Sequence, residues 1–199
     1  MNGALVELDP ETHRYAMGGA PMPGVSEIIG SLGLVDISHY REWHRARGTA
    51  IHLALRFHLE GDLNWASLDP RIVGYVRSAI RFLEDAKVMA EMVEQPLGSR
   101  VYRFCGTPDV VGMAFGDPAI IDWKSGGLTD TVGLALAGYD ILDGFTYRRR
   151  IAVQLQEDGS MPKKRDLDNS RDYPRFLAAA DLVNTYLFKG ERRAATAAA

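Results

Sequence analysis

The sequence predicts an α/β (α+β) fold in which one mixed β-sheet is flanked by helices, in the order α-β-β-β-α-β. Three observations lead to this fold class. Apolar residues recur every three or four positions over residues 70–87, which is typical of an amphipathic helix. Residues 92–124 read as short strands separated by turn residues, and a helical segment and one further alternating segment follow them. With 199 residues, 46% of them hydrophobic, the chain has the size and composition of one globular domain.

Residues 1–87 are predicted to form short strand-like pieces followed by helices. Glycines and prolines break residues 1–24 into short strand-like pieces and turns. A brief helix over residues 25–29 follows, with Ser26 as its N-cap. Gly48-Thr49 is expected to interrupt the next helical segment, so that Thr49 caps a helix over residues 50–60. Asp69-Pro70 then starts the amphipathic helix over residues 70–87, because proline suits the first helical position.

The middle and the end of the chain supply the sheet. Strands are predicted over residues 92–97, 100–105 and 108–115, and a hairpin turn at Gly116-Asp117 leads into a strand over residues 119–124. A helix is expected over residues 129–142, an alternating strand over 147–156, and a closing helix over 173–188. A polar loop lies between the last two. We expect a single domain over residues 1–190 and a flexible tail over 191–199.

Composition excludes several classes of protein. No apolar run approaches the ~18 residues that would span a bilayer, and the N-terminus lacks the features of a signal peptide, so a cytoplasmic location without membrane contact is expected. The lone cysteine, Cys105, excludes an internal disulfide, a cysteine-only zinc site and a cysteine-bound iron–sulfur cluster. The net charge of −3 is not that of a polycation, but a basic groove can lie on an acidic protein.

The polar residues most suited to chemistry are Asp109, Asp122 and Lys124. Asp122 and Lys124 are two apart on a predicted strand, so their side chains leave the same face, and the hairpin returns the Asp109 strand beside them. Carboxylate oxygens suit Mg²⁺ or Mn²⁺, and a neighbouring lysine can position water and offset phosphate charge. The alternative is a surface ion pair, but the preceding Ile120-Ile121 indicates a buried strand, where unpaired charge is costly.

These segments resemble the signature of a known family. Gly106-Thr107-Pro108-Asp109, followed by Asp122-Trp123-Lys124, is similar to the motif of the PD-(D/E)XK nuclease superfamily in its RecB-like form, found in phage exonucleases. Residues 48–52 resemble the family's glycine-to-histidine helix, residues 135–139 its Gln-x-x-x-Tyr helix, and residues 15–29 the lead-in of phage-type members. The resemblance spans residues 15–139 and implies a restriction-endonuclease-like core, whose element order is the one predicted above.

The resemblance also implies roles for individual residues. His52, Asp109 and Asp122 would hold Mg²⁺ or Mn²⁺ together with the backbone carbonyl of Trp123, and Lys124 would be the catalytic lysine. Three further residues are placed where relatives carry supporting groups, namely Glu60, Glu94 and Tyr139. Glu60 lies eight residues after His52 on the same predicted helix, so either a supporting role or a surface role suits it. Alanine stands at position 135, where the family has glutamine, which bears on how substrate is held.

The function implied is a sequence-nonspecific, metal-dependent exonuclease that hydrolyses phosphodiester bonds of DNA in phage recombination or repair. Predicted DNA contacts are the loop residues Lys163, Lys164 and Arg165, favoured over the strand residues Arg148 and Arg150. A recombination protein or a second copy of the chain is the expected protein partner. The alternative is a nucleic-acid-binding or assembly module that keeps the nuclease fold with little activity.

Overall fold

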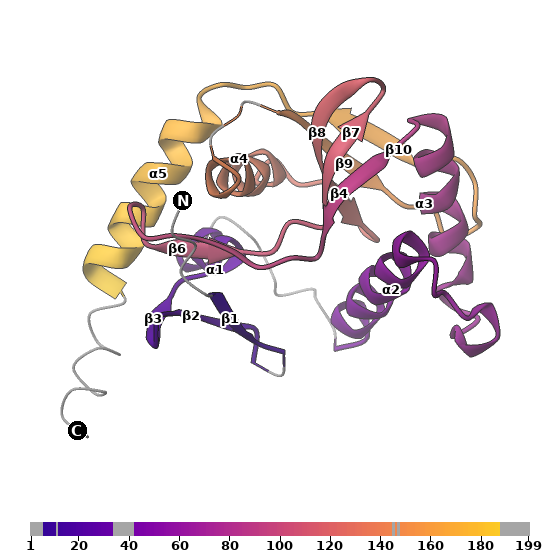
Figure 1. Ribbon diagram of the computed structural model, residues 1–199, viewed down its shortest axis with the longest axis horizontal. Helices are drawn as coiled ribbons and strands as arrows, with labels where there is room; N and C mark the ends of the chain where they lie inside the picture. Colours follow the sequence, from indigo (N-terminus) through magenta and orange to yellow (C-terminus); the bar gives the residue numbers. More distant parts are fainter. Residues whose placement is uncertain (1–5, 11, 34–41, 145, 147, 188–199) are drawn as a thin grey trace.

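A computed structural model describes residues 6–10, 12–33, 42–144, 146 and 148–187. Its centre is a five-stranded mixed sheet in the order β10-β9-β8-β7-β4 (Figure 1). The strands are β4 (Met89–Val93), β7 (Val110–Ala114), β8 (Asp117–Lys124), β9 (Arg149–Gln154) and β10 (Lys163–Asp166). In this sheet, as far as the structure describes it, β8 and β9 pair in parallel, and the crossover helix α4 (Val132–Leu142) connects them. The mixed sheet flanked by helices confirms the predicted fold class.

Helices cover both faces of this sheet (Figure 1). Helices α2 (Glu42–Glu60) and α3 (Val73–Asp85) form one apolar core with alternate residues of the strands, such as Ile121 and Trp123. Helices α1 (Val25–Ser31), α4 and α5 (Asp172–Leu182) form a second core with the other residues, such as Ile120 and Ala152. The period of two thus divides β7, β8 and β9 between two cores. Because both faces are covered, β9 is buried on both sides instead of alternating between core and solvent.

Smaller elements extend this core. Strands β1 (Val6–Asp9), β2 (Arg14–Met17) and β3 (Ala20–Met22) form a separate antiparallel sheet before α1. A hairpin of β5 (Leu97–Ser99) and β6 (Phe104–Gly106) lies between β4 and β7. A 3₁₀ turn precedes α3 at Trp65–Ser67, and a π-helical turn continues α5 over Val183–Leu187. The series α3-β4-β7-β8-α4-β9 therefore follows the predicted order, with the β5–β6 hairpin as an insertion.

Three predicted element boundaries were wrong. Helix α2 runs through Gly48-Thr49 without a break, because burial of Ile51 and Leu55 outweighs the ~1 kcal/mol that glycine costs within a helix. Residues 100–103 form the turn between β5 and β6 rather than part of a strand. Helix α3 begins at Val73 rather than at residue 70, and the Asp69 side chain accepts hydrogen bonds from the backbone and guanidinium of Arg71 in the turn before it.

Two further corrections concern a cap and a loop. Helix α1 is capped at Gly24, whose N–H donates to the Glu27 carboxylate at 3.3 Å, so Ser26 lies inside the helix. The segment predicted as a polar loop, which contains Lys163, is the edge strand β10. The backbone of this segment pairs with β9, and such pairing with a distant strand is not visible in the sequence periodicity. The predicted tail over 191–199 lies outside the described residues. Within the described part of the chain, no helix is long and apolar enough to span a membrane.

Candidate metal centre

Three acidic residues lie in line at one end of the sheet. Val93 at the end of β4 pairs with Val110 of β7, and Val110 pairs with Ile121 of β8. The next residues along these strands are Glu94, Asp109 and Asp122, so the register places them side by side. Two backbone hydrogen bonds hold this row: Glu94 N–H donates to the Asp109 carbonyl at 3.1 Å, and Trp123 N–H donates to Asp109 Oδ2 at 2.7 Å. The predicted convergence of Asp109 and Asp122 at one end of the sheet is therefore present.

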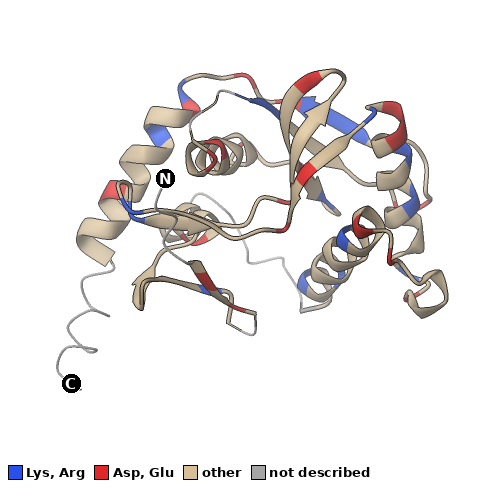
Figure 2. Cartoon of the chain, in the orientation of Figure 1, with Lys and Arg blue, Asp and Glu red and all other residues tan. Residues whose placement is uncertain are grey.

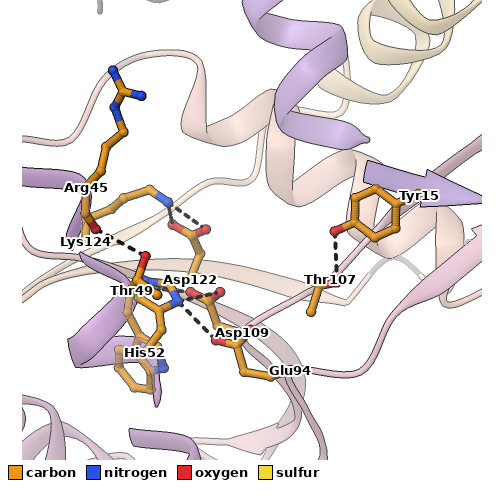
Figure 3. A network of polar contacts seen from close by, with 10 residues as sticks. Tyr15, Arg45, Thr49, His52, Glu94, Thr107, Asp109, Asp122 and Lys124 are labelled. Atoms are coloured by element: carbon orange, nitrogen blue, oxygen red, sulfur yellow. Dashed lines mark hydrogen bonds and ion pairs between the residues drawn. The ribbon is translucent and has the colours of Figure 1, made fainter. Parts of the chain in front are cut away.

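Helix α2 brings His52 to this row (Figure 3). Its Nδ1 lies 3.0 Å from Glu94 Oε1 and 3.2 Å from Asp109 Oδ1. The helix is held in place by the neighbouring Ile51 and Leu55, which are buried against the sheet. One donor atom from each of His52, Glu94 and Asp109 lies within 4.8 Å of the other two, so these three form a group that could hold a metal ion.

Glu94 joins this group through its backbone conformation. Its φ is +48°, in the left-handed region that non-glycine residues rarely adopt. The strained residue follows the last paired residue of β4, where the chain leaves the sheet for the β5–β6 hairpin. Strain of ~1–3 kcal/mol at such a residue persists only where its surroundings impose it, and it is frequent at functional sites. From the sequence, Glu94 was expected to have only a supporting role. The left-handed turn that brings it beside His52 leaves no recognisable pattern in the sequence.

Asp122 and Lys124 form the second half of the site. Lys124 Nζ lies 2.8 Å from Asp122 Oδ1 and 2.6 Å from Oδ2. Only Oδ1 accepts a hydrogen bond of good geometry from the described residues, and Oδ2 is buried. The side chain of Lys124 is 36% exposed, whereas that of Asp122 is 4% exposed. The pair therefore presents an ammonium group toward solvent above a buried carboxylate, as expected for two residues that share a strand face.

Burial and neighbouring charge shift the pKa values of the cluster. Burial of the carboxylate, with Asp109 beside it, raises the pKa of Asp122 despite the attraction of Lys124. Burial likewise raises the pKa of Glu94, against the effect of its hydrogen bond from His52. Although burial also raises the pKa of Asp109, the charges of His52 and Lys124 lower it overall. Burial lowers the pKa of His52, but attraction from Asp109 and Glu94 raises it well above 6.5.

Burial is the largest contribution to each of these pKa shifts, and the charges of the neighbouring groups act on top of it. Three carboxylates converge, and among the described residues His52 and Lys124 are the cationic groups that contact them, with the charge of Arg56 acting on Glu94 as well. The donor set of one imidazole and several carboxylates fits a divalent cation that prefers oxygen and nitrogen ligands. The buried Oδ2 of Asp122 accepts no hydrogen bond of good geometry from the described residues, although the Lys124 ammonium lies 2.6 Å from it, and this oxygen could add to the ligands of the group formed by His52, Glu94 and Asp109. The residues present therefore fit a divalent metal ion, whose positive charge would balance the converging carboxylates.

A cleft of about 500 Å³ opens beside the cluster. His52 and Lys124 line its inner end, and Arg45 and Arg47 line its wall on α2. Arg47 donates to Tyr75 Oη at 3.2 Å and to the carbonyl of Ser125 at 3.1 Å, so it ties α2 to α3 and to the segment after β8. These bonds fix His52 and Lys124 relative to each other. The cleft is positively charged along its wall and therefore suits an anionic ligand.

A set of hydroxyl groups lies on the other side of the acidic row. The hydroxyls of Tyr15 and Thr107 lie 2.9 Å apart, as Figure 3 shows beside Asp109. Tyr139 on α4 is buried, and burial together with the charges of Asp122 and Asp109 raises its pKa well above 10. Tyr139 is therefore a neutral hydroxyl group near the carboxylates, and its supporting role stays a prediction.

The structure does not bring every predicted residue to the site. The Glu60 carboxylate lies 2.8 Å from Arg56 Nε on the exposed side of α2. Arg150 is 3% exposed and donates to the carbonyl of Gly133 and to Asp172, so the prediction that it faces DNA was wrong. Arg148 is also largely buried and pairs with Asp143 at 2.7 Å. Both arginines are held by acidic or carbonyl partners that an isolated strand pattern cannot reveal.

Comparison with known proteins adds one finding. No family model matches the chain, and no curated protein matches it. Among solved structures, the chain is similar to LHK-Exo in complex with dAMP, with 14% sequence identity and a TM-score of 0.40 over 86% of this chain and 94% of that chain. At this level of similarity, the activity of the chain has to be inferred from its own residues.

Proposed function

We propose that this chain is a Mg²⁺- or Mn²⁺-dependent nuclease that hydrolyses phosphodiester bonds in DNA, of the RecB-like PD-(D/E)XK type. The observation that carries the proposal is the convergence of His52, Glu94 and Asp109 within 4.8 Å of one another beside the Asp122–Lys124 pair, at the end of a cleft with an arginine-lined wall. Carboxylates, an imidazole and a lysine at the end of an anion-binding cleft are the groups that metal-assisted phosphodiester hydrolysis requires.

Each residue would have a distinct task. His52, Glu94 and Asp109 would hold the metal, with Asp122 and the Trp123 carbonyl completing its ligands. A divalent metal bound there supplies Lewis-acid polarisation of a phosphoryl oxygen and a lowered pKa of water. Lys124, which lies 2.6 Å from Asp122, would orient the attacking water and offset charge that develops on the phosphate. Arg45, exposed on the cleft wall, would contact a neighbouring phosphate of the strand.

We further infer that the enzyme acts on DNA ends. This inference follows from the resemblance of residues 15–139 to the RecB-like motif found in phage exonucleases. Digestion from an end without sequence preference is the chemistry that recombination and repair use, and a recombination protein or a second copy of the chain would be the natural partner. The cytoplasm is the compartment we propose for it.

A cleavage assay tests this function. Linear DNA, the same DNA with blocked ends, and a covalently closed circle are incubated with Mg²⁺, with Mn²⁺ or with a chelator. We expect metal-dependent digestion of free-ended DNA and much slower attack on the other two. Equal rates on circles and linear DNA would exclude the exonuclease while leaving a nuclease. DNA binding without cleavage under any metal would favour the nuclease-fold binding module instead.

A further inference from the structure

Strand β10 carries three consecutive cations, Lys163, Lys164 and Arg165, at the edge of the central sheet (blue in Figure 2). The strand pairs with β9, and β9 pairs with β8, which carries Lys124. Residues directly opposite each other on neighbouring strands point to the same face, and successive residues point to opposite faces. The register therefore decides which of the three cations lie on the face of the candidate site.

One cross-strand row joins Lys124 to Lys163. Lys124 pairs with Gln154 of β9, and Gln154 pairs with Lys163 of β10. Two strand spacings separate the backbones of the two lysines by ~10 Å. Between them lies only the neutral side chain of Gln154, so the row holds two cations and no carboxylate. Lys163 is exposed and makes no ion pair or hydrogen bond of its side chain within the described ranges.

The next row places Arg165 on the same face. Asp122 pairs with Ala152, and Ala152 pairs with Arg165. The contacts of Arg165 agree with this: its Nη2 donates to the Leu128 carbonyl at 3.3 Å, and its Nη1 lies 3.6 Å from Asp130. Both partners belong to the segment that leads from β8 to α4, and the start of that segment lines the cleft. Arg165 thus ties β10 to the cleft wall.

Lys164 belongs to the opposite face. It pairs across the sheet with Val153, which pairs with Trp123 in the core under α2 and α3. Its Nζ lies 2.7 Å from Asp166 Oδ2 and 5.2 Å from the ring centre of Phe115. The Phe115 ring packs against Phe82 of α3, which is on the far side of the sheet from Asp122. The basic triplet is therefore divided, with two cations on the site's face and one neutralised behind it.

We propose that the face of β8, β9 and β10 at this end of the sheet is a track for the phosphodiester backbone, with Lys163 as its outer phosphate contact and Arg165 as the residue that positions the adjoining cleft wall. The proposal rests on the nuclease function proposed above, because it continues the substrate path from Lys124. Repeating phosphates of a DNA strand match cations spaced along one face, and the row from Lys124 to Lys163 holds two such cations with no carboxylate between them. Lys164 takes no part in the track.

Salt-dependent binding tests the division of the triplet. The affinity for a single-stranded oligonucleotide is measured in chelator, where no cleavage occurs, over a range of salt concentrations. Each phosphate contact contributes ~0.7 to the slope of log affinity against log salt, so Lys163→Gln should reduce the slope by ~0.7 and weaken binding about fivefold near 0.1 M salt. Lys164→Gln, the matched control on the same strand, should leave both unchanged.

Cross-linking locates the strand directly. The lone cysteine, Cys105, is buried, and burial raises the pKa of its thiol to about 11, so a thiol-reactive photo-cross-linker would label a new surface cysteine selectively. We expect Lys163→Cys to cross-link to bound DNA and Lys164→Cys to cross-link weakly or not at all.

Four outcomes decide the proposal. Loss of slope and cross-linking at position 163 alone supports it. Equal losses at 163 and 164 would overturn the assignment of faces, and no change at either, in a protein that still cleaves DNA, would overturn the track while leaving the nuclease. If the unmodified protein neither binds DNA in a salt-dependent manner nor cleaves it with metal, the proposed function and the track fail together.

Discussion

Two buried polar networks lie on this sheet, and they differ in whether their charges are balanced. In the first, Arg150 donates to the carbonyls of Gly133 and Asn169 at 2.9 Å and to Asp172 at 3.2 Å. In the second, the carboxylates of Glu94, Asp109 and Asp122 converge, and the cationic groups that contact them among the described residues are His52 and Lys124. The first network has a partner for each charge, and the second has more negative charge than its own residues neutralise.

The buried carboxylate of Asp140 is also satisfied within the fold, by hydrogen bonds rather than by a paired cation, so we group it with the balanced network. It accepts hydrogen bonds from Tyr173 Oη at 2.7 Å and from Thr146 Oγ1 at 2.9 Å, and lies 3.4 Å from the backbone nitrogen of Arg148. It is as buried as Asp122, yet no cleft opens onto it among those found in the described residues. Burial of charge alone therefore does not identify a functional site. Unbalanced charge beside an open cleft is the stronger indication.

The largest expected effect comes from breaking the balanced network. Arg150→Met leaves Asp172 buried without its cation and two carbonyls without a donor, which should lower the free energy of unfolding by ~3–5 kcal/mol. Urea denaturation measures this loss. The neighbouring Arg149→Met is the control, because Arg149 pairs at the surface with Asp166 and should cost less than ~1 kcal/mol. Similar losses for both variants would mean that the Arg150 network is not structural.

The next effect should appear in catalysis without loss of stability. Lys124→Ala removes the group proposed to act on water and on the phosphate, so cleavage should fall ~10²-fold or more while DNA affinity changes little. Single-turnover cleavage at saturating DNA with metal present measures the chemical step. Lys164→Ala is the matched control and should cleave as the unmodified protein does. If the unmodified protein and Lys124→Ala are equally inert while both bind DNA, the chain is a binding module.

The metal-dependent increase in Tm should require the acidic cluster at the candidate metal centre and should not require Asp140. A divalent metal at ~100 times its Kd stabilises the native state by ~2.7 kcal/mol, or about 5–10 °C in Tm for a chain of this size. Asp109→Asn should abolish this metal-dependent shift. Asp140→Asn should lower Tm with and without metal but keep the shift, because Asp140 belongs to the balanced network. A shift that survives in Asp109→Asn and disappears in Asp140→Asn would place the metal elsewhere.

The smallest effects should distinguish two glutamates named from the sequence. Glu94→Gln keeps the shape of the side chain but removes a charge beside His52, so the metal-dependent Tm shift should be reduced. Glu60→Gln removes only the surface pair with Arg56, which should cost ~0.3–0.5 kcal/mol and leave the shift intact. Differential scanning fluorimetry with titrated Mn²⁺ compares the two. A shift that depends on Glu60 and not on Glu94 would contradict the arrangement of the metal centre.

The amino-acid pattern alone was enough to predict the order of elements and the grouping of Asp109, Asp122 and Lys124. Periods of two and of three to four residues predicted the sheet and its covering helices, because each element's own residues carry the pattern of burial. Asp122 and Lys124 were placed on one face by the same period of two, and the Gly116-Asp117 turn brought the Asp109 strand beside them. These are short-range relationships, and each can be seen within one strand or hairpin.

Which charges are neutralised depends on contacts between segments that are distant in the sequence, and these contacts are visible in the tertiary structure alone. Glu94 meets His52 across 42 residues of chain, and Arg150 meets Asp172 across 22, so neither pairing leaves a mark on local periodicity. The division of β10 into two faces likewise depends on its register with β9 and β8, since a shift of one residue would reverse every side chain. Sequence pattern identifies which residues carry charge, but the partner of each charge is set by packing between distant segments, and that pairing separates structural charges from those available for chemistry.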